Sequence, residues 1–331
     1  MPFTKNFRTP AQLTAAARAA FRAHLEGYTT SRLLPIQTNY TLDFSFGVGQ
    51  SVLPAAASFR SFGTESEVGT IEGGQERGGK LPPLSIRTPV DEYQQLVMYN
   101  QQDGIGQAFE NRAIRNAQAI GSRLVLAQAS AIQDGKVTID ERKLKFEVDF
   151  ARKAALSATA GTSWATVATA TPLSDMEALR AVLGKRIDRS IVSLQTATYL
   201  QSNVDLIKIA LQRGSDLPSR ISWADVQAVF RDYQVGELEI NSETVVDRTG
   251  AEVPVFDPSK VVVLAASQIG TTELGVTAES LQQENGIAQS EAAGLFSGAM
   301  QKDDPAGYNV LVSAIALPVA QATNNTASLS V

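Results

Sequence analysis

Apolar residues recur every three or four positions through the middle of the chain's first half, the spacing of a helix with one apolar face. The stripe consists of Ile105, Phe109, Ala113, Ala117, Ile120, Leu124, Ala127 and Ala131. Asp103 precedes it as a candidate N-cap, and Asp134-Gly135 follows it as a turn signal. The pattern predicts a helix over residues 103–133, roughly 40 Å long, which is long for a compact domain.

A second amphipathic helix is predicted near the N-terminus, over residues 10–26. Thr9 suits the N-cap, Pro10 the first helical position and Gly27 the end. One face carries an apolar residue at every fourth position: Leu13, Ala17, Phe21 and Leu25. After this helix, partial alternation over residues 38–52 indicates an extended strand.

Alternating residues predict a hairpin over residues 136–150, with strands 136–140 and 143–149. Residues 151–172 are rich in Ala, Thr, Ser and Gly and are interpreted as a linker with one large anchor, Trp164. The chain ends in two further predicted strands within residues 308–331, joined near Asn324-Asn325.

Helical and strand patterns alternate between the linker and the final strands. Helices are predicted over residues 174–186, 196–212 and 222–231, and strands over 190–194, 237–240, 253–256 and 260–265. Single cores rarely grow beyond roughly 250–300 residues. A chain of 331 residues therefore has room for two subdomains.

Glycines and charged residues are concentrated in residues 63–79, which hold six glycines. Such a segment cannot form a core, so it predicts a loop or an exposed hairpin, with residues 56–62 and 81–88 as its two legs. A phosphate-binding loop is not expected, because Gly79-Lys80 is followed by Leu81 and Pro82 where that motif needs a hydroxyl residue and a helix.

Charge is uneven along the chain. The net charge is −5, yet residues 1–35 carry five cationic side chains against Glu26 alone. The remainder is acidic, which argues against a dedicated nucleic-acid reader because such a protein presents a concentrated basic face. No run approaches the roughly 20 apolar residues of a membrane span, so no membrane association is expected.

Little catalytic chemistry is available to this sequence. It has no cysteine, and its one histidine, His24, is expected to be a solvated helix residue. A Ser-His-Asp triad would need a placed nucleophile and an acid around it. No catalytic residue, metal site or cofactor is therefore predicted. A soluble hydrolase is kept as the alternative that would show a protected pocket.

Three stretches carry a family resemblance: "FENRAIRNAQAIGSRLVLAQASAIQDGKVTIDERKLKFEVDFARKA" (109–154), "TSW" (162–164) and "DPAGYNVLVSAIALPVAQATNNTASLSV" (304–331). With the order of the predicted elements, they resemble the Hong Kong 97-type capsid proteins of tailed bacteriophages, and among these the lambda-type major capsid protein E family. The resemblance implies an α+β fold. Its parts are an N-arm (1–52), an E-loop (53–95), a P-domain (96–172) with spine helix 103–133 and hairpin 136–150, an A-domain (173–300), and C-terminal strands (301–331) returning to the P-domain.

The same resemblance implies a structural function without enzymatic activity. Copies would form hexamers and pentamers of an icosahedral shell around double-stranded DNA, contacted non-specifically. The shell would assemble in the host bacterial cytoplasm with a portal and a separate scaffolding protein, because the arm begins within a few residues of Met1. The lambda-type branch is stabilised by a separate decoration protein, and the resemblance leaves room for such a partner here. The alternative is an encapsulin-like protein nanocompartment.

Two groups of charged residues are the expected assembly contacts. On the E-loop they are Glu65, Glu67, Glu72, Glu76, Arg77, Lys80 and Arg87. On the N-arm they are Arg8, Arg18, Arg22 and Arg32. Some relatives cross-link their subunits through an E-loop lysine. For Lys80 a solvated or salt-bridging role is favoured over an isopeptide.

Overall fold

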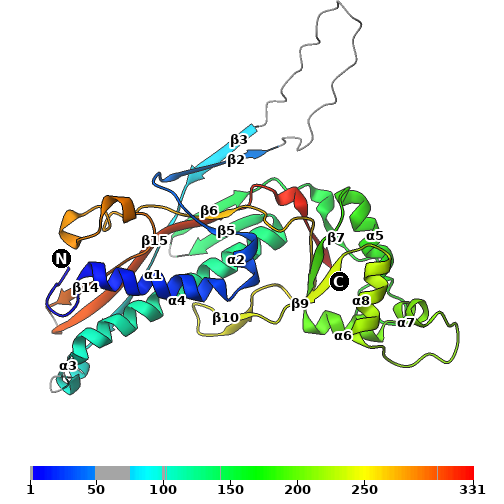
Figure 1. Cartoon of the computed structure of the whole chain (residues 1–331), viewed down its shortest axis with the longest axis horizontal. Helices are drawn as coiled ribbons and strands as arrows, with labels where there is room; N and C mark the ends of the chain where they lie inside the picture. Colours follow the sequence, from blue (N-terminus) through cyan, green and yellow to red (C-terminus); the bar gives the residue numbers. More distant parts are fainter. Residues whose placement is uncertain (1–2, 49–74, 99–100, 102, 142, 304) are drawn as a thin grey trace, which may run out of the picture.

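The computed structural model describes residues 3–48, 75–98, 101, 103–141, 143–303 and 305–331 (Figure 1). The molecule is elongated and has two lobes. The helices are α1 (Pro10–Glu26), α2 (Thr29–Leu33), α3 (Glu92–Met98), α4 (Gly104–Asp134), α5 (Pro172–Leu183), α6 (Leu194–Ser202), α7 (Val204–Leu211) and α8 (Trp223–Asp232). Short 3-10 turns are η1 (Ala154–Leu156), η2 (Gln283–Asn285), η3 (Gln289–Glu291) and η4 (Thr323–Asn325). None of the described helices is long and apolar enough to cross a membrane.

Strands form five separate sheets in the described residues. The first nine are β1 (Ile36–Thr38), β2 (Asp43–Val48), β3 (Gln75–Lys80), β4 (Pro83–Val90), β5 (Lys136–Glu141), β6 (Leu144–Asp149), β7 (Ser157–Thr159), β8 (Arg189–Val192) and β9 (Glu237–Ile240). The others are β10 (Thr244–Val246), β11 (Glu252–Pro254), β12 (Lys260–Leu264), β13 (Thr271–Leu274), β14 (Phe296–Lys302), β15 (Gly307–Val319) and β16 (Thr326–Ser330).

Helix α4 is the axis of the first lobe and confirms the predicted long helix. Its apolar stripe is buried, from Phe109 to Ala131, against α1 and a sheet of order β1-β13-β15-β14, in which β4 pairs with β15. Asp103 precedes α4, but its side chain accepts no capping hydrogen bond from the helix. Its φ is 58°, and its carboxylate pairs with Arg8. The predicted hairpin 136–150 is confirmed as β5 and β6.

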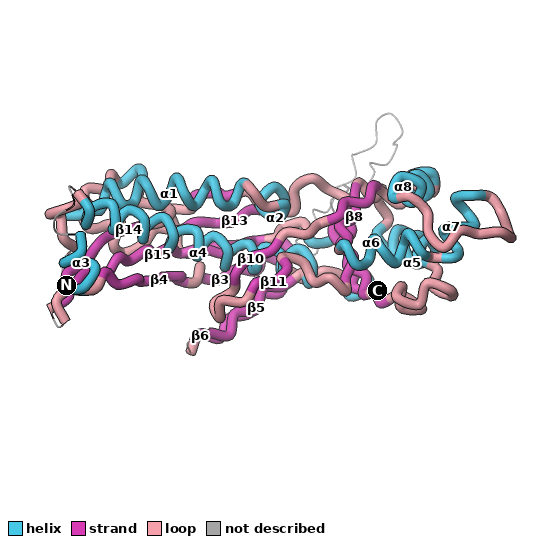
Figure 2. The backbone as a smooth tube through the Cα atoms, turned by 90° about the horizontal axis from the view of Figure 1, so that it is seen from below, coloured by secondary structure: helices cyan, strands magenta, loops and turns pink. Residues whose placement is uncertain are grey.

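Helix α1 has its predicted bounds, fixed by a reciprocal capping box between Thr9 and Gln12. Its apolar residues, including Leu13 and Phe21, are buried in the core that α4 shares. Figure 2 shows α1 lying alongside α4. The helical part of the predicted N-arm is therefore packed into the body of the first lobe.

The second lobe surrounds a sheet of order β7-β16-β12-β8-β9, with α5 to α8 beside it (Figure 1). Strand β12 is buried on both faces, since Val261 and Val263 pack in the second core while Val262 and Leu264 pack in the first. The two lobes therefore meet across this sheet.

Two predictions for the second lobe are corrected and a third is confirmed. The helix expected over 196–212 is two helices, because the Asn203 side chain accepts from Leu206 N and starts α7. Residues 151–172 include a strand, β7, that pairs with β16, so they are more than a linker. Trp164 is an anchor as predicted, 1% exposed, with its Nε1 donating to Asp175 at 2.9 Å.

The assignment of segments to the two lobes also differs from expectation. The A-domain was expected over 173–300, but β13 and β14 lie in the sheet of the first lobe. Of the two C-terminal strands, β15 returns to the first lobe as expected, whereas β16 joins the second. The fragment 81–88, expected as a leg of an exposed arm, is mostly β4, which pairs with β15 over eight residues.

Candidate assembly surfaces

A two-stranded ribbon of β2 and β3 projects from the first lobe (Figure 1). Within the described parts of the chain, these strands pair only with each other. Phe44 and Phe46, 4% and 5% exposed, anchor the base, and the Phe46 ring lies 5.2 Å from that of Phe150. The ribbon is thus held at one end by aromatic packing.

Two glycines of β3 let the two strands approach. A Cβ on Gly78 would lie 2.5 Å from the carbonyl oxygen of Phe44, and one on Gly79 would lie 3.1 Å from the Phe44 ring. Both contacts are closer than an ordinary van der Waals distance, and the first is with backbone that cannot move aside easily. In this part of the glycine-rich segment, glycine therefore serves close packing.

The predicted E-loop residues fall in three places. Glu65, Glu67 and Glu72, with the predicted leg 56–62, lie outside the described residues. Glu76, Arg77 and Lys80 are exposed on β3, opposite Gly47, Phe46 and Asp43. Arg87 is exposed on β4, opposite Leu311, so it belongs to the main sheet of the first lobe. Their roles between subunits stay predictions.

Of the predicted N-arm arginines, two bind partners within the chain and two are exposed. Arg8 forms an ion pair with Asp103 and lies 3.6 Å from Glu110, at the start of α4. Arg18 Nε donates to the Leu295 carbonyl at 2.8 Å, and burial lowers the pKa of this guanidinium. Arg22 and Arg32 are exposed. Arg18 therefore holds α1 to its own chain, and the roles of the four arginines between subunits stay predictions.

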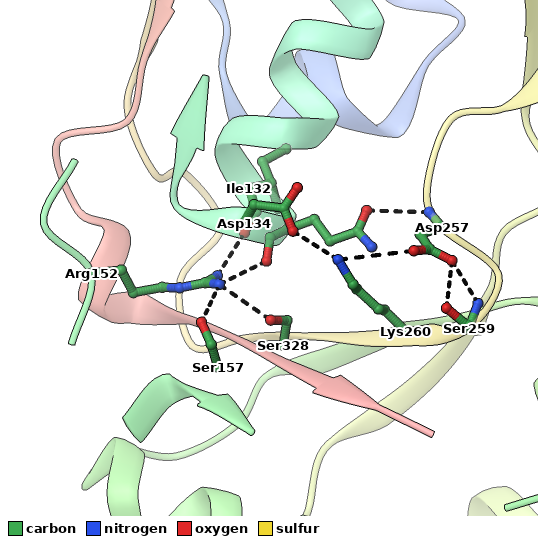
Figure 3. Close-up of polar contacts among 9 residues, drawn as sticks. Ile132, Asp134, Arg152, Ser157, Asp257, Ser259, Lys260 and Ser328 are labelled. Atoms are coloured by element: carbon green, nitrogen blue, oxygen red, sulfur yellow. Dashed lines mark hydrogen bonds and ion pairs between the residues drawn. The ribbon is translucent and has the colours of Figure 1, made fainter. Parts of the chain in front are cut away.

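Arg152 joins the end of α4 to the second lobe (Figure 3). Its guanidinium donates to the carbonyls of Ile132 at 3.2 Å and Gln133 at 2.8 Å. It also donates to the hydroxyls of Ser157 on β7, at 2.7 Å, and Ser328 on β16, at 3.2 Å. Helix-end carbonyls carry partial negative charge, so a cation is favoured there. Burial lowers the pKa of Arg152.

A lysine extends this joint along β12. Lys260 Nζ lies 2.9 Å from the Asp134 carboxylate and 3.9 Å from that of Asp257 (Figure 3). Although burial acts in the opposite direction, hydrogen bonds from Ser259 and the charge of Lys260 lower the pKa of Asp257. Helix α4 ends beside this joint at Gly135, whose φ of 68° favours glycine.

The candidate chemistry outside these surfaces is sparse. His24 is half-buried rather than solvated, with Nε2 3.0 Å from Ser122 Oγ, and burial lowers its pKa. Among the described residues, no cluster of three His, Cys, Asp or Glu side chains could hold a metal ion. A surface hollow of about 490 Å³ lies beside α8 and is lined by Arg186, Asp188, Arg231 and Glu237, among others. These four side chains are exposed and carry charges of both signs.

Two features of the structure were not predicted from the sequence. Helix α3 follows the glycine-rich segment and was not predicted, although Tyr93, Leu96 and Val97 have the spacing of one helical face. Arg152 lies in the predicted linker, and no periodic pattern distinguishes it from a solvated arginine.

The profile of the family described as phage major capsid protein E matches residues 9–331. The chain belongs to this family. It is a shell-forming phage major capsid protein, and its place is the capsid of the virion. No curated protein sequence gives a significant match.

Solved structures agree on the capsid fold at low sequence identity. The putative capsid protein of a prophage of E. coli CFT073 has a TM-score of 0.63 and 15% identity, covering 96% of this chain and 98% of its own. A phage-related protein of Bordetella bronchiseptica RB50 has a TM-score of 0.52 and 13% identity, covering 94% and 96%. The satellite phage P4 procapsid has a TM-score of 0.50 and 8% identity, covering 95% and 90%. The α+β, Hong Kong 97-type fold is thereby established for this chain.

Proposed function

We propose that copies of this capsid protein assemble as hexamers and pentamers into an icosahedral shell around the double-stranded DNA of a tailed phage. The observation that carries the proposal is the β2–β3 ribbon. It is anchored at its base by Phe44 and Phe46, and it exposes Glu76, Arg77 and Lys80 on a strand with no other described partner. An exposed ribbon edge with mixed charges is suited to pairing with a neighbouring copy.

Strand β3 of the ribbon lies within the proposed E-loop (53–95), whose further proposed contacts are Glu65, Glu67, Glu72 and Arg87. An exposed ion pair contributes only about 0–1 kcal/mol. The same pair recurs at every equivalent contact of a closed shell, so a small change per contact affects closure strongly. Arg22 and Arg32 are the proposed exposed contacts of the N-terminal region, with scaffold, DNA phosphate or a neighbouring acid. Arg8 and Arg18 hold the N-terminal region in place through Asp103 and the Leu295 carbonyl of the same chain.

The remaining partners and the non-enzymatic role belong to the same proposal. A separate scaffolding protein, a portal and a decoration protein act with the shell in the host bacterial cytoplasm. The acidic body contacts packaged DNA only non-specifically, since the net charge of −5 keeps most of the wall from a polyanion. The role needs no cofactor. Lys80 acts as a solvated or ion-pairing residue.

Electron microscopy of particles from infected or expressing cells tests this proposal, together with their nucleic-acid content. Closed shells built of hexamers and pentamers, filled with double-stranded DNA when the packaging proteins are present, are the expected result. Shells that hold a cargo protein and never DNA would instead favour an encapsulin-like compartment. Small particles with hydrolytic activity would contradict both shell functions.

A further inference from the structure

Helix α3 directs its two glutamines towards its own chain. Gln95 Nε2 donates to the carbonyls of Asp91 at 3.3 Å and Ala306 at 3.4 Å. Gln94 Oε1 accepts a hydrogen bond from the Arg112 guanidinium of α4. The helix is therefore attached to the first lobe by its two glutamines, and it buries no residue.

The apolar side chains of α3 point the other way. Tyr93, Leu96 and Val97 are 75%, 67% and 53% exposed. Their spacing of three and four residues places them on one helical face. A helix on a protein surface ordinarily turns such a face to the core. The reversed polarity of α3 indicates that this face packs against something outside the chain.

The end of the molecule that bears α3 also carries charges of both signs. Asp91 and Glu92 are exposed at the start of α3, and Lys5 is exposed on the N-terminal segment. None of the three forms an ion pair within the described part of the chain. Phe7, 37% exposed, extends the apolar surface.

Two contacts place these groups at one end of the first lobe. The Phe7 ring lies 5.9 Å from that of Tyr308 at the start of β15, and Gln95 of α3 reaches Ala306 in the adjoining turn between β14 and β15. Figures 1 and 2 both show α3 at the end of the molecule far from the second lobe. We call Lys5, Phe7, Asp91, Glu92, Tyr93, Leu96 and Val97 the end patch.

We propose that the end patch is a contact between two copies of this chain in the shell. The inference rests on the proposed function, because a shell subunit is surrounded by its own copies. A contact between identical chains needs both halves of each interaction on every copy. The end patch supplies them, with the acids of α3 complementary to Lys5 and with apolar side chains for the centre of the contact.

Thiol labelling tests the proposal, because the chain has no cysteine of its own. The variant Leu96→Cys introduces one thiol in the end patch. Leu194→Cys, at a leucine that is 63% exposed on α6, is the matched control on the second lobe. Both are labelled with a maleimide as free chains and as particles that contain only this protein, and again after the particles are dissociated.

In particles, labelling at position 96 is expected to be slower than in the free chain by at least about tenfold, with recovery after dissociation. Labelling at position 194 is expected to change much less. Equal rates at position 96 in particles and free chain would overturn the inference while the proposed function stands. Equal slowing at both positions would also overturn it, because the particle would then exclude the reagent generally.

Failure of the proposed function would look different. If the wild-type chain forms no particles, self-assembly itself is contradicted. Labelling at position 96 that stays as fast at high chain concentration as in dilute solution would then contradict the end-patch contact as well. A polar variant, Leu96→Ser, gives a second measurement: it should keep its helical circular dichroism and lose closed shells, whereas Leu194→Ser should keep both.

Discussion

Replacing Arg152 by methionine should weaken the joint between α4 and the second lobe. Methionine keeps an apolar stem of similar length but removes the four hydrogen bonds to Ile132, Gln133, Ser157 and Ser328. The two serine hydroxyls can turn to other partners, whereas the two carbonyls at the end of α4 lose a charged donor. A buried acceptor left without a partner costs about 1–3 kcal/mol.

The loss is partly offset because the guanidinium no longer has to be desolvated on folding. We therefore expect the free energy of unfolding to fall by about 2–4 kcal/mol. Urea unfolding followed by tryptophan fluorescence measures it, since the buried Trp164 lies in the second lobe. Arg115→Met is the control, because Arg115 is exposed on α4 and forms no ion pair in the described residues. A loss below about 0.5 kcal/mol, or one equal to the control's, would refute this account of the joint.

Three further predictions concern the ribbon and the N-terminal helix. The triple variant Glu76→Ala, Arg77→Ala, Lys80→Ala should leave the stability in urea unchanged and reduce the yield of closed shells. The control Lys145→Ala with Glu147→Ala on β6 should leave the shell yield unchanged. An unchanged shell yield in the triple variant would show that the ribbon is not an assembly contact. Gly78→Ala should lower the stability of the ribbon by about 1–3 kcal/mol, because its Cβ would meet the Phe44 carbonyl at 2.5 Å, and faster amide exchange in β2 would report it. Because burial lowers the pKa of His24, the unfolded chain binds more protons, so stability should fall as the pH drops below about 6.5. His24→Gln should flatten that slope, and an equal slope in the variant would assign it to other groups.

Periodic elements could be predicted from the sequence because their signal is local. The stripe from Ile105 to Ala131 and the capping residues around α1 define each helix without reference to the rest of the chain. The alternation of the β5–β6 hairpin is local in the same sense. These elements have the predicted type and nearly the predicted bounds.

Pairing between distant strands was not predictable in this way. The sequence pattern of β4 is the same whether the strand lies in an exposed arm or in the folded body. Its actual partner, β15, is more than two hundred residues away in sequence. Strand β12 is a continuous apolar run, and nothing in it shows that Val261 and Val262 serve different cores. Lobe membership of β13, β14 and β16 was missed for the same reason.

The sequence predicted which segments would expose charged residues, but it did not predict the contacts of individual side chains. Charged residues near glycines indicated an exposed segment, and Glu76, Arg77 and Lys80 are exposed. Whether an arginine faces outward or back to its own chain depends on tertiary contacts. Arg18 and Arg22 look alike in the sequence, yet only Arg18 meets the Leu295 carbonyl.

Light scattering of the purified chain under assembly conditions tests the central claim most directly, which is that copies of this protein build a closed shell. The account predicts a narrow population of megadalton particles that disappears when the subunits are dissociated. A monodisperse monomer of 35.3 kDa under every assembly condition would contradict it.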